Sequence, residues 1–363
     1  MTIPALTIRD LRVRSVAVPM KRPLGTSSTR LASALLALFD LETEEGVTGR
    51  AYAFGIGTST AALKGVVPDV VASIKGQLAA PADIYARLER RFRLFGLQGH
   101  VGIVHACVDV ACWDAVARAA GLPLVRLLGG TPRPISAYNS NGLGLSDPVK
   151  LADEAQELLD DGFSAVKLRL GYPTLEQDLA AARAVKKRIP SSAILMSDYN
   201  QALTPAEAAR RGRALDGEGL AWIEEPVRHD DYAGCAHVAR EVATPIQIGE
   251  NFVGPRAMAA ALAQKACDYA MPDLQRIGGV TGWLRAAAIA DSVGMEMSSH
   301  LFPEVSAHLL AVTPTCHWLE YVDWAAPILQ QPLRVKDGHA QIPDRAGNGL
   351  EWDEDAVNRY LID

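Results

Sequence analysis

The chain has 363 residues, of which 49% are hydrophobic and 21% charged, and its formal net charge is −6 at pH 7. This length suits a (β/α) barrel of about 250 residues with a smaller second domain. The acidic balance and the scattered lysines and arginines argue against a nucleic-acid partner. No uninterrupted apolar run approaches the roughly 20 residues needed to cross a bilayer, so we expect no membrane partner.

The cysteines and the N-terminus indicate the compartment. Five cysteines are present without a Cys-x-x-Cys pair: Cys107, Cys112, Cys235, Cys267 and Cys316. An odd number of this kind is typical of reduced thiols rather than of a secreted disulfide framework. The first 13 residues lack the charged head and apolar run of a signal peptide. We therefore expect a soluble cytoplasmic protein.

Residues 1–133 have the pattern of an α+β domain. Alternating apolar positions predict strands at 6–19 and 35–42, with a turn around Gly46. Helical patterns follow at 60–77, 83–95 and 101–120, and the last ends at Gly121. Strands first and helices afterwards favour an α+β unit.

Residues 134–321 have a repeating pattern of short strands and helices. Strands are expected at 135–140, 165–170, 193–200, 220–226, 245–250, 268–273, 295–300 and 317–321. Helices are expected between them, for example at 148–160, 175–189, 204–215, 255–264 and 283–293. Thr204, Pro205 and Glu207 predict a capping box at one helix start, and we interpret the glycine run at 276–283 as a tight βα turn.

Eight strands at intervals of about 25 to 30 residues predict a parallel (β/α) barrel. The segment 322–363 has no further βα unit, and we expect it to pack on the first domain and complete it.

Polar residues stand at the C-terminal ends of six expected strands, one for each βα unit: Asp198, Glu224, Glu250, Asp273, His300 and Glu320. In a barrel these positions meet at one face, where active sites form. A single acid there is as well explained by a helix cap or a loop salt bridge. Six in phase with the strands indicate an active site.

Three of these acids predict a metal site. Asp198, Glu224 and Glu250 come from consecutive strands, and a set of carboxylates without cysteine or paired histidines suits Mg²⁺ rather than zinc. The ion would keep positions open for substrate oxygens. Glu225 is a rival to Glu224, because strand alternation turns only one of them inward and spacing cannot choose between them.

Two cations and a histidine complete the expected site. Lys167 and Arg169 are two residues apart on one strand, so both face the barrel centre; there they would pair with the acids or bind a substrate carboxylate. His300 and Asp273 end neighbouring strands, so the aspartate could fix the imidazole tautomer of a general acid/base. A structural hydrogen bond is the alternative for His300.

Long strings in register with these strands make the chain resemble the mandelate racemase subgroup of the enolase superfamily. They include WIEEP (222–226), IGENFVGP (248–255), AMPDLQRIGGVTGW (270–283) and MSSHLFPEVSAHLLAVTPTCHWLE (297–320). The resemblance implies an α+β capping domain over a modified (β/α)7β barrel, a bound Mg²⁺ and a homo-oligomer.

The resemblance also implies roles for individual residues. It favours Glu224 over Glu225 as a metal ligand, makes Asp273 and His300 a catalytic dyad, and makes Glu320 a hydrogen-bond donor to the substrate carboxylate, which Lys167 would also contact. It places further residues near the substrate, some of them on a mobile loop of the capping domain: Leu24, Ser28, Leu31, Tyr52, Phe54, Ser140 and Asn200.

One position departs from the family pattern. Where the family has Lys-x-Lys, this chain has Lys167-x-Arg169, and the second lysine is the base for the opposite face of the substrate. Deprotonating an arginine instead of a lysine at neutral pH costs at least about 3 kcal/mol more, or roughly two decades in rate. Arg169 could instead hold the substrate and leave His300 as the only base.

The sequence thus predicts an enzyme that takes the α-proton from a small 2-hydroxycarboxylate with Mg²⁺. A racemase or epimerase is the first hypothesis, since enediolate stabilisation by Mg²⁺ is the logic of this superfamily. An acid-sugar dehydratase that uses His300 alone is the alternative, favoured by Arg169 and Ser28. A muconate-type cycloisomerase is disfavoured, and a non-catalytic carboxylate-binding protein is a remote alternative.

Overall fold

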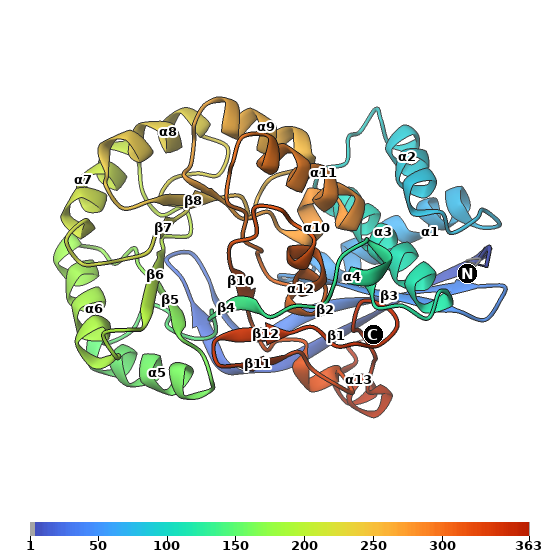
Figure 1. Cartoon of the computed structure of the whole chain (residues 1–363), viewed down its shortest axis with the longest axis horizontal. Helices are drawn as coiled ribbons and strands as arrows, with labels where there is room; N and C mark the ends of the chain where they lie inside the picture. The colour runs from blue at the N-terminus through green and yellow to red at the C-terminus, as the bar shows by residue number, and fades with distance from the viewer. Residues whose placement is uncertain (1–3, 363) are drawn as a thin grey trace.

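A three-stranded antiparallel sheet and three helices form the N-terminal part of the chain in a computed structural model, which describes residues 4–362 (Figure 1). The strands are β1 (Ile8–Gly25), β2 (Arg30–Thr43) and β3 (Thr48–Gly55), in the order β1-β2-β3. The helices are α1 (Ser59–Ile74), α2 (Pro81–Arg91) and α3 (Gly99–Ala119). The sequence pattern predicts the turn at Gly46 but not β3, the strand after this turn.

Helix α3 is the central helix of this part. By length and composition it could span a membrane, but 67% of its apolar window is buried inside the protein. It packs so closely on β3 that a Cβ atom at Gly49 would lie 1.9 Å from the Ala111 carbonyl oxygen. Such burial is typical of the core helix of a folded domain, and it requires glycine at position 49.

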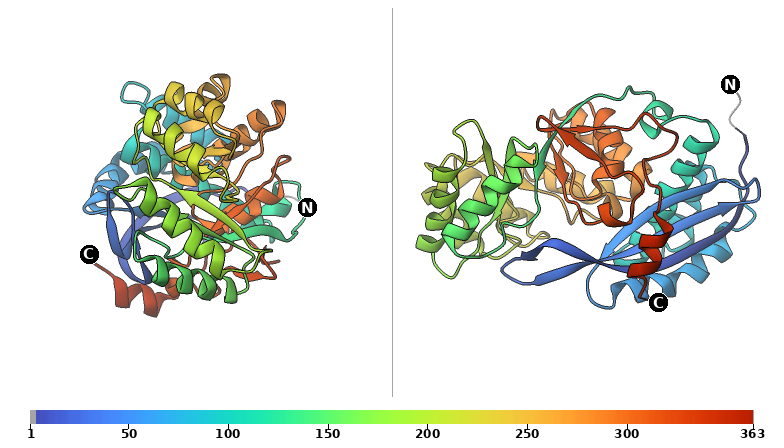
Figure 2. Two further views of the ribbon diagram at one scale, coloured as in Figure 1. Left: turned by 90° about the vertical axis from the view of Figure 1, so that its left-hand side faces the viewer. Right: turned by 90° about the horizontal axis from the view of Figure 1, so that it is seen from below.

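The β1–β2 hairpin reaches from this sheet to the barrel (Figure 2). Its last pairs are Leu24 with Leu31 and Gly25 with Arg30, and the N–H of Thr26 donates to the Thr29 carbonyl at 2.9 Å to close the turn. The Gly25 carbonyl accepts from the N–H of Leu145, in the loop after β4, at 3.0 Å. The hairpin tip is therefore fixed to a loop at the C-terminal face of the barrel.

Parallel strands form the barrel. They are β4 (Ile135–Asn139), β5 (Ala165–Arg169), β6 (Ile194–Asp198), β7 (Ile223–Glu224), β8 (Ile246–Ile248), β9 (Tyr269–Ala270) and β10 (Leu319–Tyr321), and β10 pairs with β4. Residues 295–300, predicted as a full strand, make only isolated bridges, among them Ala270 with Met297 and Asp273 with His300. The predicted fold class, a barrel with an α+β capping part, is confirmed.

Helices surround these strands (Figure 1). They are α4 (Leu124–Leu127), α5 (Pro148–Asp160), α6 (Leu175–Arg188), α7 (Pro205–Leu215), α8 (Tyr232–Glu241), α9 (Gly254–Ala263), α10 (Leu274–Ile277), α11 (Gly279–Ser292) and α12 (Pro303–Ala311). The predicted βα turn at 276–283 is wrong in detail, because Gly278 (φ +99°) and Gly279 (φ +69°) join α10 to α11. The left-handed backbone there explains the glycines.

Thr204 accepts from the N–H of Glu207 at 3.3 Å and so begins α7 as predicted. The Glu207 carboxylate, however, binds Arg210 and Arg211, so we find only half of the expected capping box there. A complete box occurs instead at the start of α6, between Thr174 and Gln177.

The C-terminal segment contacts both parts of the molecule. It contains η1 (Ala326–Ile328), β11 (Arg334–Lys336), β12 (His339–Gln341) and α13 (Glu354–Tyr360), and β12 pairs antiparallel with β4. The first half of this segment, which we expected to pack on the first domain, thus pairs with the barrel. The second half contacts the N-terminal part: the indole of Trp352 donates to Asp40 at 2.7 Å, and α13 packs on β1.

The contact between β3 and α3 allows a direct test. Gly49→Ala should lower the stability of the protein by about 3 kcal/mol, the upper end of the usual cost of overpacking, since the new methyl group meets a backbone carbonyl that cannot rotate away. The midpoint of chemical denaturation measures this loss. Gly65→Ala in α1 is the matched control: its Cβ would meet nothing within 4 Å, so it should gain up to about 1 kcal/mol. Equal midpoints for the two variants would contradict the described packing.

Candidate active site

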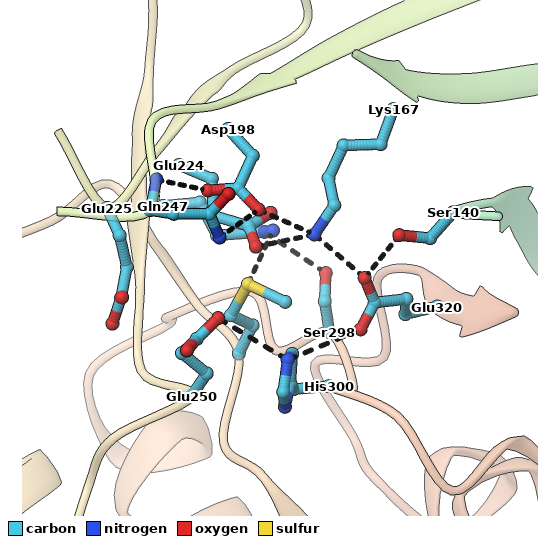
Figure 3. Close-up of polar contacts among 12 residues, drawn as sticks. Ser140, Lys167, Asp198, Glu224, Glu225, Gln247, Glu250, Ser298, His300 and Glu320 are labelled. Carbon is cyan, nitrogen blue, oxygen red and sulfur yellow. Dashed lines mark hydrogen bonds and ion pairs between the residues drawn. The ribbon is translucent and has the colours of Figure 1, made fainter. Parts of the chain in front are cut away.

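Lys167 is at the centre of a buried polar cluster at the C-terminal ends of the strands (Figure 3). Its Nζ lies 2.6 Å from Glu224 Oε1, 2.7 Å from Glu320 Oε1 and 3.3 Å from Asp198 Oδ2. Burial by itself would lower the pKa of Lys167, but Glu224 and Glu320 outweigh burial and raise it well above its usual value. Lys167 is therefore a fixed positive charge that holds three carboxylates together.

Asp198 and Glu224 end the adjacent strands β6 and β7 and are paired in register. Asp198 accepts from the backbone N–H of Asn200 at 2.8 Å and from its side-chain amide at 3.1 Å. Burial raises the pKa of Glu224 to about 8, with Lys167 opposing and Asp198 adding to the rise. The Oδ1 atom of Asn200 is buried and has no partner among the described residues. Both predicted metal ligands and Asn200 thus lie together.

Glu250 follows β8, and its carboxylate lies apart from this pair (Figure 3). Its Oε2 is 3.3 Å from His300 Nε2, and its Oε1 accepts from Asn251 Nδ2 at 3.1 Å. Among residues 4–362, no three acidic, histidine or cysteine side chains are close enough to hold a metal as they stand. A common metal site would therefore require the Glu250 side chain to move towards Asp198 and Glu224.

Glu225 is buried as deeply as Glu224 but has different neighbours. It accepts from Gln201 Nε2 at 2.7 Å and from Asn251 Nδ2 at 3.1 Å. Its φ of +37° ends the extended strand geometry after Glu224. Strand alternation therefore does not apply to Glu225, and the contact with Lys167 belongs to Glu224.

His300 and Asp273 form the predicted pair. His300 Nδ1 is 2.7 Å from Asp273 Oδ2, while Asp273 Oδ1 accepts from two backbone N–H groups at the start of α10. His300 Nε2 faces Glu250 and Glu320, at 3.3 and 3.8 Å. Burial opposes a charge on His300, but Glu250, Glu320 and Asp273 outweigh burial and raise its pKa to about 10. The imidazole is therefore protonated at neutral pH in this arrangement.

Glu320 accepts hydrogen bonds rather than donating them in this arrangement. Its carboxylate binds Lys167 Nζ, the Ser140 hydroxyl at 2.7 Å and the Leu301 N–H at 2.9 Å. Burial would raise the pKa of Glu320, but Lys167 and His300 hold it below its usual range. The donor role implied by the resemblance would require Glu320 to gain a proton, because here it is ionised.

Arg169 is buried at the end of β5 without an acidic partner. Its Nη1 donates to the carbonyls of Ser140 at 2.7 Å and Gly142 at 2.8 Å, and its Nη2 donates to the Ser140 hydroxyl at 2.9 Å. Among the described residues it forms no ion pair, and its Nε–H has no acceptor. Arg169 is thus a buried cation with unused donor capacity, held towards β4 and not among the acids that Lys167 binds.

The residues of the N-terminal part expected near the substrate are less closely connected to this cluster. The Tyr52 hydroxyl donates to Glu304 Oε2 at 2.8 Å, and the Phe54 ring packs on Trp324 with centroids 4.9 Å apart. The other three lie near the hairpin tip, where Leu24 is buried and Ser28 is exposed: Leu24, Ser28 and Leu31. Across residues 4–362, none of these five side chains forms a hydrogen bond to Lys167, His300 or Glu320.

Sequence reasoning missed several polar residues of the site. Gln247 on β8 accepts from the Ser298 hydroxyl at 3.3 Å in the middle of the cluster (Figure 3). Arg276 donates to the Glu250 carbonyl at 3.0 Å and to Asn251 Oδ1. A polar residue inside an otherwise apolar strand, as in IQI, is the signal that could have identified Gln247.

Two family models match the chain. The model described as mandelate racemase / muconate lactonizing enzyme, N-terminal domain, matches residues 8–129, and the model described as enolase C-terminal domain-like matches residues 150–356. The chain therefore belongs to the enolase superfamily, in the mandelate racemase / muconate lactonizing enzyme group.

Solved structures agree with this membership. An enolase from the alphaproteobacterium BAL199 with bound magnesium is 46% identical, with a TM-score of 0.95 over 98% of this chain and 100% of that one. An enolase from Bradyrhizobium in complex with magnesium and mandelic acid is 41% identical, with a TM-score of 0.95 over the whole of both chains.

Curated relatives have several activities. L-talarate/galactarate dehydratase of Salmonella typhimurium is 28% identical over 90% of this chain and 82% of its own length. The 3,6-anhydro-alpha-L-galactonate cycloisomerase of Streptomyces coelicolor is 30% identical, over 94% and 96%. The chain is thus an enzyme, and both isomerases and dehydratases are among its relatives.

The Tyr52–Glu304 contact predicts a pH effect on stability. Burial raises the pKa of Glu304 from 4.5 to about 7, against the opposing effect of hydrogen bonds. Because the folded-state pKa is the higher one, the contribution of the neutral carboxyl is complete below about pH 4.5 and is lost as the pH rises through about 7. Glu304→Gln should therefore become more stable relative to the unsubstituted protein between pH 5 and pH 8, by up to about 3 kcal/mol.

Denaturation midpoints at pH 5 and pH 8 measure this difference. Glu44→Gln, which removes an exposed carboxylate, is the control and should shift both midpoints equally. If the difference between Glu304→Gln and the unsubstituted protein is the same at both pH values, the buried neutral carboxyl is refuted.

Proposed function

We propose that this enzyme removes the α-proton of a small 2-hydroxycarboxylate, with His300 as the base. The observation that carries the proposal is the contact of 2.7 Å between His300 Nδ1 and Asp273 Oδ2, which fixes the ring so that Nε2 faces the carboxylate cluster. Asp273 is itself held by two backbone N–H groups, so the orientation of the imidazole is set before substrate arrives.

The charge of the site supports a bound divalent cation. The cluster has more acids than cations. Lys167 pairs with three of the acids, Arg276 lies 3.9 Å from Glu250, and Arg169 has no acidic partner among the described residues. The six buried or half-buried acids are Asp198, Glu224, Glu225, Glu250, Asp273 and Glu320. Hard oxygen ligands suit Mg²⁺, and solved relatives contain magnesium. We assign Asp198, Glu224 and Glu250 as its ligands; there the ion would offset the surplus charge and act as a Lewis acid on substrate oxygens.

The chain's own residues would perform the remaining steps. Lys167 and Arg169 bind the substrate carboxylate. As Lys167 shifts towards the substrate, it leaves Glu320, which can then take up a proton and donate a hydrogen bond to the substrate carboxylate. His300 Nε2 accepts the α-proton as the C–H bond breaks, and the electron pair moves into the carboxylate to give an enediolate. The surplus negative charge of the carboxylates keeps His300 protonated in this arrangement. This charge must be offset first, because only a neutral imidazole accepts a proton.

A racemase or epimerase is the first candidate, supported by the relative that binds mandelic acid and by the epimerases among the curated relatives. An acid-sugar dehydratase is the second, supported by Arg169: a guanidinium tied to the Ser140 and Gly142 carbonyls is a poor second base. In the second case the electron pair expels the β-hydroxyl, which leaves as water with the proton from His300. The homo-oligomer and the cytoplasmic location remain predictions.

Hydrogen exchange separates these reactions. The protein with Mg²⁺ in D₂O, incubated with 2-hydroxy acids and with aldonic or aldaric acids, should exchange the α-proton of at least one substrate, as followed by NMR. Inversion indicates a racemase, and a 2-keto-3-deoxy product indicates a dehydratase. His300→Asn should slow exchange by about 10²- to 10⁴-fold, because the general base is lost.

His237→Asn, on the exposed face of α8, is the control and should leave the exchange rate unchanged. Full exchange by His300→Asn would contradict the assigned base. No exchange with any acid of either group would contradict the proposed function.

Arg169→Lys tests the second face of the substrate. If racemisation is the activity, a lysine there lowers the cost of deprotonation by about 3 kcal/mol, so inversion should accelerate by up to about two decades. The ratio of inverted to retained product in D₂O reports this. Inversion that is unchanged or slower would show that Arg169 is not a weak second base, and would favour dehydration.

A further inference from the structure

A cavity of about 480 Å³ lies outside the active site, where the N-terminal helices meet the barrel. The helices α2 and α3 contact α11 there, and all three lie together in Figure 1. The cavity is lined by residues of α2, α3, the loop that starts α9, α10 and α11: Tyr85, Glu89, Leu97, Gln98, Gly102, His105, Val253, Gly254, Pro255, Arg256, Arg276, Gly278 and Arg285.

The lining of this cavity is positively charged, although the chain as a whole is acidic. Three of the lining residues are arginines, Arg256, Arg276 and Arg285, and one, Glu89, is acidic. Burial lowers the pKa of His105 to about 4, so this residue adds no charge at neutral pH. The lining therefore has a surplus of two positive charges, on a chain whose net charge is −6.

Two of these arginines have no acidic partner. Within residues 4–362, neither Arg256 nor Arg285 forms an ion pair, and both side chains are exposed, although Arg285 hydrogen-bonds the Tyr85 side chain. The Arg285 guanidinium lies over the Tyr85 ring, with its carbon 4.5 Å from the centroid. Stacking of this kind fixes the plane of a guanidinium while its edge N–H groups stay available. Tyr85 thus orients Arg285, and Arg256 adds a second exposed guanidinium to the same lining.

The N-termini of two helices add to the positive charge of the cavity lining. Gln98 and Val253, the N-cap residues of α3 and α9, both line the cavity. Neither helix has a side-chain cap or an acidic residue in its first turn. A carboxylate or hydroxyl caps α5, α6, α7, α8, α10 and α13, whereas α1, α2, α4, α11 and α12 also lack a side-chain cap. Uncapped N-termini present free N–H groups and partial positive charge.

We propose that this cavity is a second binding site for a small anionic molecule bearing a phosphate or carboxylate group, held mainly by Arg256 and Arg285. Guanidinium groups bind such oxyanions with paired, charge-assisted hydrogen bonds. The volume is in the range of small-molecule sites. The proposal does not depend on the chemistry assigned to the active site.

Arg276 joins this cavity to the active site. It lines the cavity, and its Nη1 donates to the carbonyl of Glu250 and to Asn251, whose amide holds the carboxylates of Glu225 and Glu250. The Arg276 side chain would therefore lie between an anion in the cavity and the proposed metal ligand Glu250. For the same reason Arg276 is kept unchanged in every variant that tests the cavity.

Calorimetric titration of the full chain, without Mg²⁺ and at fixed ionic strength, tests the site. Inorganic phosphate and succinate are the two probes, and they distinguish a phosphate-bearing from a carboxylate-bearing ligand. At least one should bind saturably, one molecule per chain. In the double variant Arg256→Gln/Arg285→Gln its affinity should fall at least about tenfold.

The matched control is Arg90→Gln/Arg93→Gln, which removes two exposed arginines close to α2 that do not line the cavity. Its affinity should stay within about twofold of the unsubstituted protein. Unchanged denaturation midpoints would verify that both double variants fold. If Arg256→Gln/Arg285→Gln does not fold, the single variant Arg256→Gln replaces it.

Three results would overturn the proposal. The first is that neither probe binds saturably. The second is that the control loses as much affinity as the double variant, which would mean that only overall charge matters. The third is binding that survives in Arg256→Gln/Arg285→Gln but is lost in Arg169→Gln, which would place the anion in the active site.

Discussion

The clustering of buried carboxylates around Lys167 is the constraint on which the rest of the site depends. Carboxylates taken out of water repel one another and need either a cation or a proton. Lys167 holds Asp198, Glu224 and Glu320 together through one ammonium group. Burial and then the neighbouring carboxylates raise the pKa of Glu224, and the carboxylates raise the pKa of His300 against the effect of burial. A site that stores this much negative charge is prepared for a divalent cation, and its ionisation changes when the cation and an anionic substrate bind.

The barrel and the capping part contribute differently to this arrangement. Parallel strands bring the side chains at their C-terminal ends to one face, so residues more than 150 positions apart, such as Lys167 and Glu320, come into contact. The β1–β2 hairpin reaches the same face through the Gly25–Leu145 hydrogen bond. The capping part thus positions residues at the rim, while the acid–base chemistry belongs to the barrel.

Arg169 links the chemistry of the site to its reaction class. Three hydrogen bonds to Ser140 and Gly142 hold its guanidinium at the end of β4, and that geometry supports binding better than proton transfer. In both proposed functions the complete His300–Asp273 side takes the α-proton, and the Arg169 side is not basic. The proposed functions differ in the fate of the enediolate, which is either reprotonated with inversion or loses water.

The sequence by itself determined the fold class and the strand ends at which the candidate site residues stand, because strand period and βα spacing place each polar residue at a strand end regardless of detailed packing. Asp198, Asp273 and His300 could be placed at strand ends for this reason, whereas spacing alone left the choice between Glu224 and Glu225 open. Tertiary structure alone decided which groups touch: that Glu320 is an ionised acceptor, that β12 joins β4, and that the glycine run joins two helices. These depend on contacts between distant segments and on left-handed backbone conformations, which no local periodicity encodes.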